Sequence, residues 1–127
     1  MSDYGKFLNT AIESVISQSY KNIEIIIIDD GSSDESEDVI KEWKLADNKI
    51  NFIRNPSPKG LIFCANRALK NAQGEYIIRL DADDFFEANA IKNLLRDFES
   101  AYEVNTNTVG IFGNYNEIDK NANFIRT

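Results

Sequence analysis

The stretch at residues 76–86, YIIRLDADDFF, places an apolar run directly before a group of carboxylates. The run at residues 76–80 has the β-branched and aromatic composition of a strand covered on both faces. Asp81 and Asp83 are two residues apart, so on extended backbone they share one side and Asp84 points elsewhere. Unpaired carboxylates are costly to bury, so these acids must meet water, donors or a cation. Two acids on one side form an oxygen site suited to Mg²⁺ or Mn²⁺.

A second apolar run ends in the same way. Residues 23–34, IEIIIIDDGSSD, contain a β-branched run that is too short to span a membrane and predicts a central strand. It stops at Asp29 and Asp30, and Gly31 lets the chain turn. An acidic strand end that stood alone could equally be a turn whose carboxylates are simply solvated. Because ligands of open α/β sheets bind at the carboxyl ends of strands, two acidic ends predict one shared crevice.

The rest of the chain alternates between two kinds of apolar pattern. Helical spacing predicts helices near residues 7–16, 34–46, 61–72 and 91–98, and short apolar runs predict strands near residues 25–28, 50–53, 76–80 and 109–118. The last residues, 120–127, are compatible with a hairpin. Strands that alternate with helices predict right-handed crossovers and a mostly parallel sheet. The expected fold class is therefore α/β.

Composition limits the size and the partners of the protein. A chain of 127 residues, 43% of them hydrophobic, is expected to form one domain over residues 1–127. Its net charge of −7 and its pI of about 4.6 argue against a nucleic-acid surface, which needs clustered Lys and Arg. A phosphate ligand would therefore need a cation as mediator.

The cysteine and histidine counts narrow the chemistry further. Cys64 is the single cysteine, so an internal disulfide is excluded and a small core residue in a reducing compartment is expected. Histidine is absent, which removes His-ligated zinc and the Ser-His triad and leaves carboxylates as the chemical groups. We find no signal peptide or transmembrane run, so we expect a cytoplasmic location, with the full-length protein at the cytoplasmic face of a membrane as an alternative.

Three separated blocks carry a family resemblance: GKFLNTAIESVISQSYKNIEIIIIDDGSSD, then IRNPSPKGLIFCAN, then QGEYIIRLDADD. Together they resemble the nucleotide-sugar-binding half of the inverting family-two glycosyltransferases, which have the A-type fold, and the resemblance spans nearly the whole chain. It implies a Rossmann-like, three-layer α/β/α sandwich. It also implies transfer of a sugar from a nucleoside diphosphate sugar, with a uridine diphosphate sugar favoured, to a glycan or lipid-linked acceptor in polysaccharide, lipopolysaccharide or cell-wall glycan synthesis.

The resemblance implies roles for five residues. Asp83 matches the last acid of the family's DxD motif and would hold Mn²⁺ or Mg²⁺ between the two donor phosphates. Asp81 matches the first acid and is expected near the ribose or the metal. Asp30 matches the acid that recognises the nucleobase, and Asp29 would support the strand end beside it. Lys59 lies in a loop that borders the nucleotide in similar proteins, although a solvated lysine is an equal alternative.

The chain also departs from the family pattern. Asn66 fits a recurrent asparagine, whereas Ala65 stands where many relatives have arginine, so an arginine contact to the nucleotide is in doubt. We find no segment that matches the acceptor-binding half, so the catalytic base, a carboxylate, is expected outside this chain. Should this chain transfer sugar by itself, Glu87 and Glu117 would be the first candidates for that base.

A third departure concerns the start of the chain. Relatives open with an apolar strand, whereas residues 1–4 match only the turn after it. We therefore expect a fragment that is truncated at both ends and inactive by itself. Without that strand the sheet lacks a central member, and a strand from a second copy would fill the gap in a homodimer.

Other classes of protein remain as alternatives. A receiver-type signalling domain also gathers acids at strand ends to hold Mg²⁺, and Asp29, Asp30 and Asp81 would form that pocket. Such a domain also needs a lysine at the end of a late strand, and none stands at the end of the strand predicted at residues 109–118. A haloacid-type phosphohydrolase would need a DxDx[TV] motif, which Asp84 and the phenylalanine after it do not provide. A non-catalytic nucleotide-binding fragment also fits the sequence.

Overall fold

The computed structural model describes residues 3–31, 34–107, 117–118 and 124–126. They group into two compact units, Met1–Asn89 and Ala90–Thr127. The first unit contains both acidic strand ends that the sequence singles out.

A pair of parallel strands forms the sheet of the first unit. Strand β1 (Ile25–Asp30) pairs with β2 (Ile50–Asn55), with Ile25 opposite Ile50 and Asp30 opposite Asn55. The β-branched isoleucines favour extended backbone, as the sequence predicts. Because the strands are parallel and in this register, both carboxyl ends lie at one edge of the sheet.

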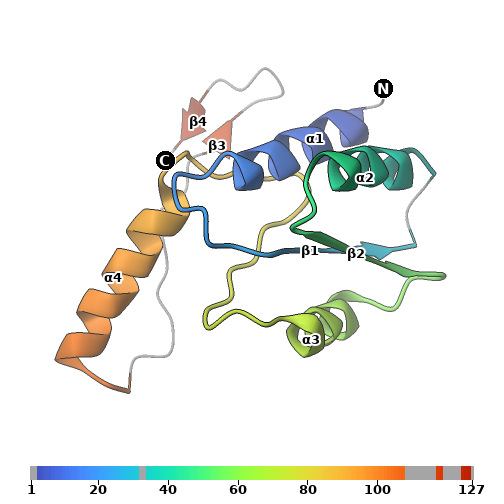
Figure 1. Ribbon diagram of the computed structural model, residues 1–127. Coiled ribbons are helices and arrows are strands. Elements are labelled where there is room, and N and C mark those ends of the chain that lie inside the picture. Colours follow the sequence, from blue (N-terminus) through green and yellow to red (C-terminus); the bar gives the residue numbers. More distant parts are fainter. Residues whose placement is uncertain (1–2, 32–33, 108–116, 119–123, 127) are drawn as a thin grey trace. The chain divides into compact units, whose positions relative to one another are not determined.

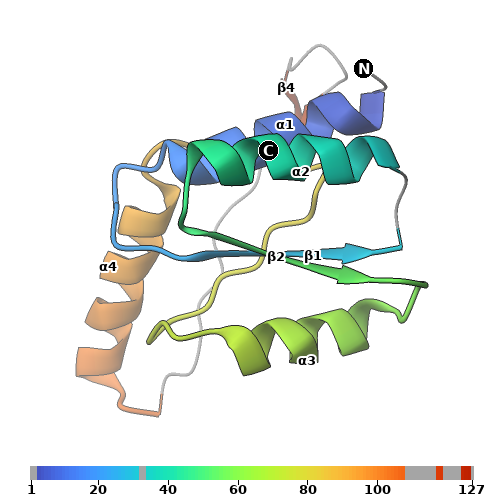
Figure 2. The same cartoon turned by 45° about the vertical axis from the view of Figure 1, so that its right-hand side comes forward.

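Helices cover both faces of this sheet. Helices α1 (Asp3–Ile16) and α2 (Asp34–Ala46) lie side by side over one face, and α3 (Leu61–Asn71) lies over the other (Figures 1 and 2). The three-layer α/β/α arrangement with a parallel sheet is therefore confirmed.

The buried core of the first unit lies between the α1–α2 layer and the sheet. It is built from aliphatic side chains of all four of these elements: Leu8, Ile12, Ile25, Val39, Ile40 and Ile50. Trp43 packs at its margin, and its indole N–H donates to Asn9 Oδ1 at 2.7 Å. Trp43 therefore belongs to the core packing, and its polar atom has a hydrogen-bond partner.

Gly31 makes the turn after β1 feasible. Its φ of 79° lies in the left-handed region, which side chains with a Cβ rarely adopt. A Cβ at this position would also lie 2.9 Å from Pro58 Cδ. The turn after β1 and the loop before α3 therefore approach each other where another residue would not fit.

A carboxylate in front of β1 holds the end of α3. Glu24 Oε1 accepts hydrogen bonds from the backbone N–H groups of Gln73 at 2.6 Å and Gly74 at 3.2 Å. The C-cap residue of α3 is Ala72. Glu24 thus anchors the chain beyond the helix to the start of β1.

The strand predicted at residues 76–80 is wrong. These residues form no regular secondary structure, and Ile77 is 60% exposed. A strand needs a neighbour to satisfy its backbone groups, and within the described residues the sheet of the first unit holds β1 and β2 alone. The apolar composition of the run predicted burial, but strand pairing depends on a partner that composition does not specify.

The second unit contains α4 (Ala90–Val104) and a short hairpin. In the hairpin, β3 (Glu117–Ile118) pairs antiparallel with β4 (Phe124–Arg126), so the predicted return of the chain is confirmed. Most of the strand predicted at residues 109–118 lies outside the described residues. Within the part of the chain that the structure describes, no helix is long and apolar enough to cross a membrane.

Core packing is testable with two substitutions on the same helix. Ile40 is 2% exposed and Leu45 is 91% exposed. Ile40→Ala should lower the free energy of unfolding by about 2–5 kcal/mol, because it removes buried methyl groups and leaves a cavity. Leu45→Ala should change it by less than about 0.5 kcal/mol. Urea denaturation of both variants measures this, and similar losses in the two would contradict the assigned core.

Candidate functional site

The acids after residue 80 gather in a turn. The backbone N–H of Asp84 donates to the carbonyl of Asp81 at 3.0 Å, which reverses the chain. Carboxylate oxygens of Asp81, Asp83 and Asp84 all lie within 4.8 Å of one another. The expectation that Asp84 points elsewhere assumed extended backbone and is wrong, because the turn brings all three acids together. We call these three residues the acid turn.

The acid turn concentrates negative charge. Burial, followed by the charges of Asp83 and Asp81, raises the pKa of Asp84 above its usual range. One cation already lies beside the group, since Arg79 Nη2 is 2.7 Å from Asp81 Oδ1, in an exposed ion pair. Several carboxylate oxygens at this spacing suit a hard divalent cation, whose ligands are oxygens.

The end of α1 positions the residues next to the acid turn. Gln18 is fully buried, and its Nε2 donates to the carbonyl of Glu87 at 2.7 Å. The backbone N–H of Phe86 donates to Ser14 Oγ at 3.1 Å. Ala82, inside the turn, packs against the hydrophobic core. The acid turn is therefore fixed to the α1 layer although it follows no strand.

Asp30, the last residue of β1, holds the start of α3. Its Oδ1 accepts from Asn55 Nδ2 at 2.9 Å and from the backbone N–H of Lys59 at 2.8 Å. Its Oδ2 accepts from the backbone N–H of Gly60 at 3.0 Å, and Gly60 is the N-cap residue of α3. The Asn55 bond, followed by the Lys59 N–H, lowers the pKa of Asp30 to about 2. Asp30 is therefore ionised at neutral pH.

Asp29 and Asp30 have different environments. Asp29 is 5% exposed, and its Oδ2 lies 3.8 Å from Nε of Arg54, which also pairs with Glu37. Asp30 is half-buried. Asp29 thus belongs to the interior of the strand end, whereas Asp30 reaches the surface where a ligand can meet it.

The loop and helix after β2 hold the other predicted residues. Lys59 contacts Asp30 through its backbone, and its side chain is exposed. Ala65 and Asn66 are exposed on α3. Within the described residues, no hydrogen bond or ion pair joins Asp30 or Lys59 to the acid turn.

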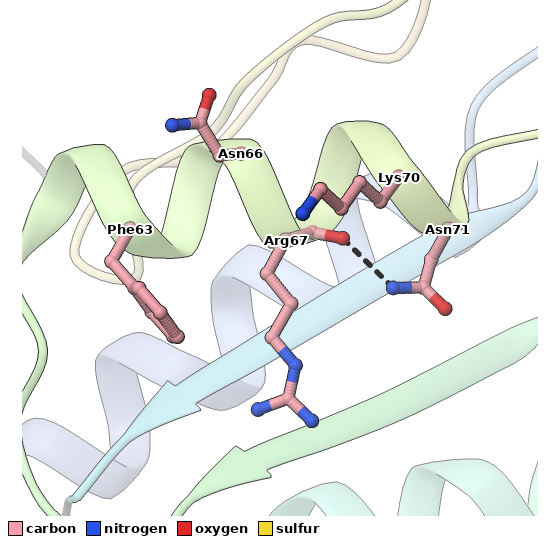
Figure 3. Close-up of a pocket in the computed structure, with 5 residues that line it drawn as sticks. All are labelled: Phe63, Asn66, Arg67, Lys70 and Asn71. Carbon is pink, nitrogen blue, oxygen red and sulfur yellow. Dashed lines mark hydrogen bonds between the residues drawn. The ribbon is translucent and has the colours of Figure 1, made fainter.

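A cavity of about 420 Å³ lies along α3. It is lined by Phe63, Asn66, Arg67, Lys70 and Asn71, and the side chains of Phe63 and Arg67 extend to one side of the helix (Figure 3). It is open and contains no acid, so we place the candidate site at the carboxylates and not in this cavity.

Sequence reasoning missed Asn55, a polar partner of Asp30, and Arg67, which bonds to Asn55. Asn55 ends β2 opposite Asp30 and is fully buried. Arg67 Nη1 donates to Asn55 Oδ1. The position of Asn55 at the carboxyl end of a strand could have identified it as a site residue. No local sequence pattern, however, connects Asn55 to Arg67.

Comparison with known proteins decides the family. The profile described as Glycosyl transferase family 2 matches residues 3–126. The chain belongs to this family. The match includes β1, α3 and the acid turn, so the resemblance noted in the sequence is confirmed. The receiver-type and phosphohydrolase interpretations gain no support from these comparisons.

Individual relatives agree with this assignment. The chain is 34% identical over 124 residues to glycosyltransferase GlyG of Streptococcus pneumoniae, covering 97% of this chain and 40% of GlyG. It is 45% identical over 89 residues to the Escherichia coli UDP-Glc:alpha-D-GlcNAc-diphosphoundecaprenol beta-1,3-glucosyltransferase WfaP, covering 70% of this chain and 35% of WfaP. It is 32% identical over 115 residues to WfgD of the same species, which is named for the same glucosyltransferase activity, covering 91% of this chain and 43% of WfgD. The chain thus spans less than half the length of these relatives.

The pKa of Asp30 predicts a pH dependence of stability. Its folded value of about 2 lies below the ordinary value of 3.8, so its carboxylate stabilises the fold above pH 3.8 and this contribution is lost as the pH falls towards 2. Asp30→Asn should therefore be less stable than the parent at pH 6, and the difference should shrink at pH 3. Urea unfolding at both pH values measures this. A difference that is equal at both would contradict the assigned interactions.

Proposed function

We propose that this chain binds the nucleotide part of a nucleoside diphosphate sugar, together with Mn²⁺ or Mg²⁺, for inverting sugar transfer. The observation that carries the proposal is the acid turn, three carboxylates within 4.8 Å of one another in a family 2 chain. A chain with a net charge of −7 and no histidine needs a cation to attract a diphosphate.

The acid turn would hold the cation through its carboxylates. Asp83 and Asp81 are the ligands proposed from the sequence, and the turn adds Asp84 as a third. When bound, the cation offsets the negative charge that develops on the departing diphosphate. Arg79 pairs with Asp81 and adds a positive charge beside the site. The hydrogen bonds with Ser14 and Gln18 hold the backbone at residues 86–87, just after the acid turn.

Asp30 would recognise the nucleobase. Its ionised carboxylate accepts hydrogen bonds and donates none, which suits the imide N–H of uracil. The names of WfaP and WfgD, which give UDP-Glc as the donor, favour uridine in the nucleotide. Asp29 would support Asp30 from the interior, and Lys59 would border the nucleotide with its exposed side chain.

The acceptor and the general base are assigned to parts of the protein beyond this chain. A glycan or lipid-linked acceptor is proposed, and the lipid-diphosphate acceptors named for WfaP and WfgD favour the lipid-linked kind. No carboxylate of this chain is proposed as the base. The homodimer and the cytoplasmic location also stay predictions. Within the described residues β1 pairs with β2 on one edge, which leaves the other edge for a further strand.

The metal assignment predicts which acids matter for binding. Asp83→Asn should weaken uridine diphosphate binding in the presence of Mn²⁺ by roughly tenfold or more, because it removes a charged ligand. Asp38→Asn, at an exposed acid of α2, removes the same charge elsewhere and should leave affinity unchanged. Titration calorimetry with and without Mn²⁺ measures both. Metal-independent binding, or equal effects of the two substitutions, would disprove the metal site.

The nucleobase assignment predicts a preference between nucleotides. The chain should bind uridine diphosphate roughly tenfold more tightly than adenosine diphosphate, since adenine lacks an equivalent imide donor. Asp30→Ala should remove this preference and leave Mn²⁺ affinity intact. Competition calorimetry compares the two nucleotides. If the variant kept the preference, Asp30 would not contact the base, and if it lost Mn²⁺ as well, Asp30 would belong to the metal site.

A further inference from the structure

We propose that Asn55 is a positioning residue of the nucleotide site, which fixes how Asp30 presents its oxygens to a ligand and ties that carboxylate to Arg67. This inference rests on the proposed role of Asp30 in binding the nucleobase. It assigns a function to a buried side chain that the family's acidic motifs do not include.

Asn55 lies at the meeting point of three elements. It ends β2, stands opposite Asp30 of β1 in the strand register and is fully buried. Its Nδ2 donates to Asp30 Oδ1 at 2.9 Å and to Cys64 Sγ at 3.4 Å. Its Oδ1 accepts from Arg67 Nη1 on α3. All of its polar atoms are therefore engaged, as burial requires.

A carboxamide suits this position because it carries both a donor and an acceptor. Arg67 presents a guanidinium that can only donate, so the carboxamide oxygen must face Arg67 and the amide nitrogen must face Asp30. An apolar side chain would leave Asp30 and Arg67 without this partner. A carboxylate would place a second negative charge beside Asp30.

The bond from Asn55 has a consequence for ligand binding. Asp30 Oδ1 accepts from both Asn55 and Lys59, which occupy its two lone pairs. Asp30 Oδ2 accepts from Gly60, and among the described residues the remaining contact of the carboxylate is the thiol of Cys64, a weak donor. A ligand N–H would displace the thiol of Cys64 more easily than it would displace any of the N–H groups that donate to Asp30. The carboxylate therefore has room for one further strong donor, which matches the single N–H of a uracil imide.

The surroundings of Asn55 make a sharp test available. Its titratable and charged neighbours are Asp30 on β1, Cys64 and Arg67 on α3, and Arg54 beside it on β2, which is paired with Glu37. Asn55→Asp puts a carboxylate next to Asp30, and two carboxylates that share a site raise one pKa strongly. When that pair takes up one proton, the O–H restores a donor between the two side chains and leaves an acceptor for the guanidinium.

We therefore expect N55D to bind uridine diphosphate with Mg²⁺ at least tenfold more weakly than the parent at pH 7.5, and to recover towards parental affinity at pH 5. The readout is the ratio of N55D affinity to parental affinity at each pH, because the diphosphate and Asp84, whose pKa is raised, take up protons as the pH falls and affect both proteins alike, whereas Asp30 of the parent stays ionised. The matched control is N51D, at an exposed asparagine of the same strand, which adds the same charge and should show no pH-dependent loss. Calorimetry gives the affinities, and circular dichroism at both pH values checks that each variant is folded.

A purely structural role for Asn55 would weaken binding equally at both pH values, and that result would overturn the proposal. Should N55D not fold, Arg67→Met tests the same network at the half-buried Arg67. We expect a several-fold loss of affinity, because the Asn55 amide loses its fixed orientation. Unchanged affinity would overturn the proposal. If the parent bound no uridine diphosphate at any pH, the proposed function would fail together with this inference. Tight binding by the parent with no pH-dependent recovery in N55D would remove this inference alone.

Discussion

The carboxylate of Asp30 is the interaction on which the first unit depends. It stands at the end of β1 and accepts hydrogen bonds from the end of β2 and from Lys59 and Gly60, the two residues just before α3. A negative charge at a helix N-terminus meets unsatisfied N–H groups and the positive end of the helix dipole. Glu24 makes the corresponding bonds beyond the other end of α3. Two carboxylates that flank β1 thus fix the helix along the strand, and the same arrangement leaves Asp30 ionised and partly exposed.

The acid turn is built by a different means. No strand delivers it, so its position comes from hydrogen bonds between α1 and residues 86–87 and from the packing of Ala82 on the core. Holding three carboxylates close together costs free energy through mutual repulsion, and after burial the charges of Asp83 and Asp81 contribute to the raised pKa of Asp84. A bound cation would relieve this repulsion. The turn is therefore more useful as a ligand site than as a stabilising element.

Local patterns in the sequence account for much of the fold. The isoleucine run predicted β1, helical spacing predicted α1 to α4, and the acids at strand ends identified both halves of the candidate site. The prediction of a strand at residues 76–80 was wrong, because a strand must pair with a neighbouring strand and composition does not show whether one is present. Asp84 was predicted to point away from Asp81 and Asp83, because the alternation of side chains along a strand does not predict a turn. The Asn55–Arg67 bond joins two elements through side chains, and no periodicity records such a contact.

The central claim is that the acid turn and Asp30 serve one ligand. Nuclear magnetic resonance of the labelled chain tests this directly, with Mn²⁺ as a paramagnetic probe and uridine diphosphate with Mg²⁺ as a ligand. We expect traces of Mn²⁺ to broaden the amide signals of Asp83 and Asp84. We also expect the nucleotide to shift these signals together with the amides of Lys59 and Gly60, which bond to Asp30. Nucleotide-induced shifts confined to the α3 cavity around Lys70, with residues 81–84 and 59–60 unaffected, would contradict a shared ligand.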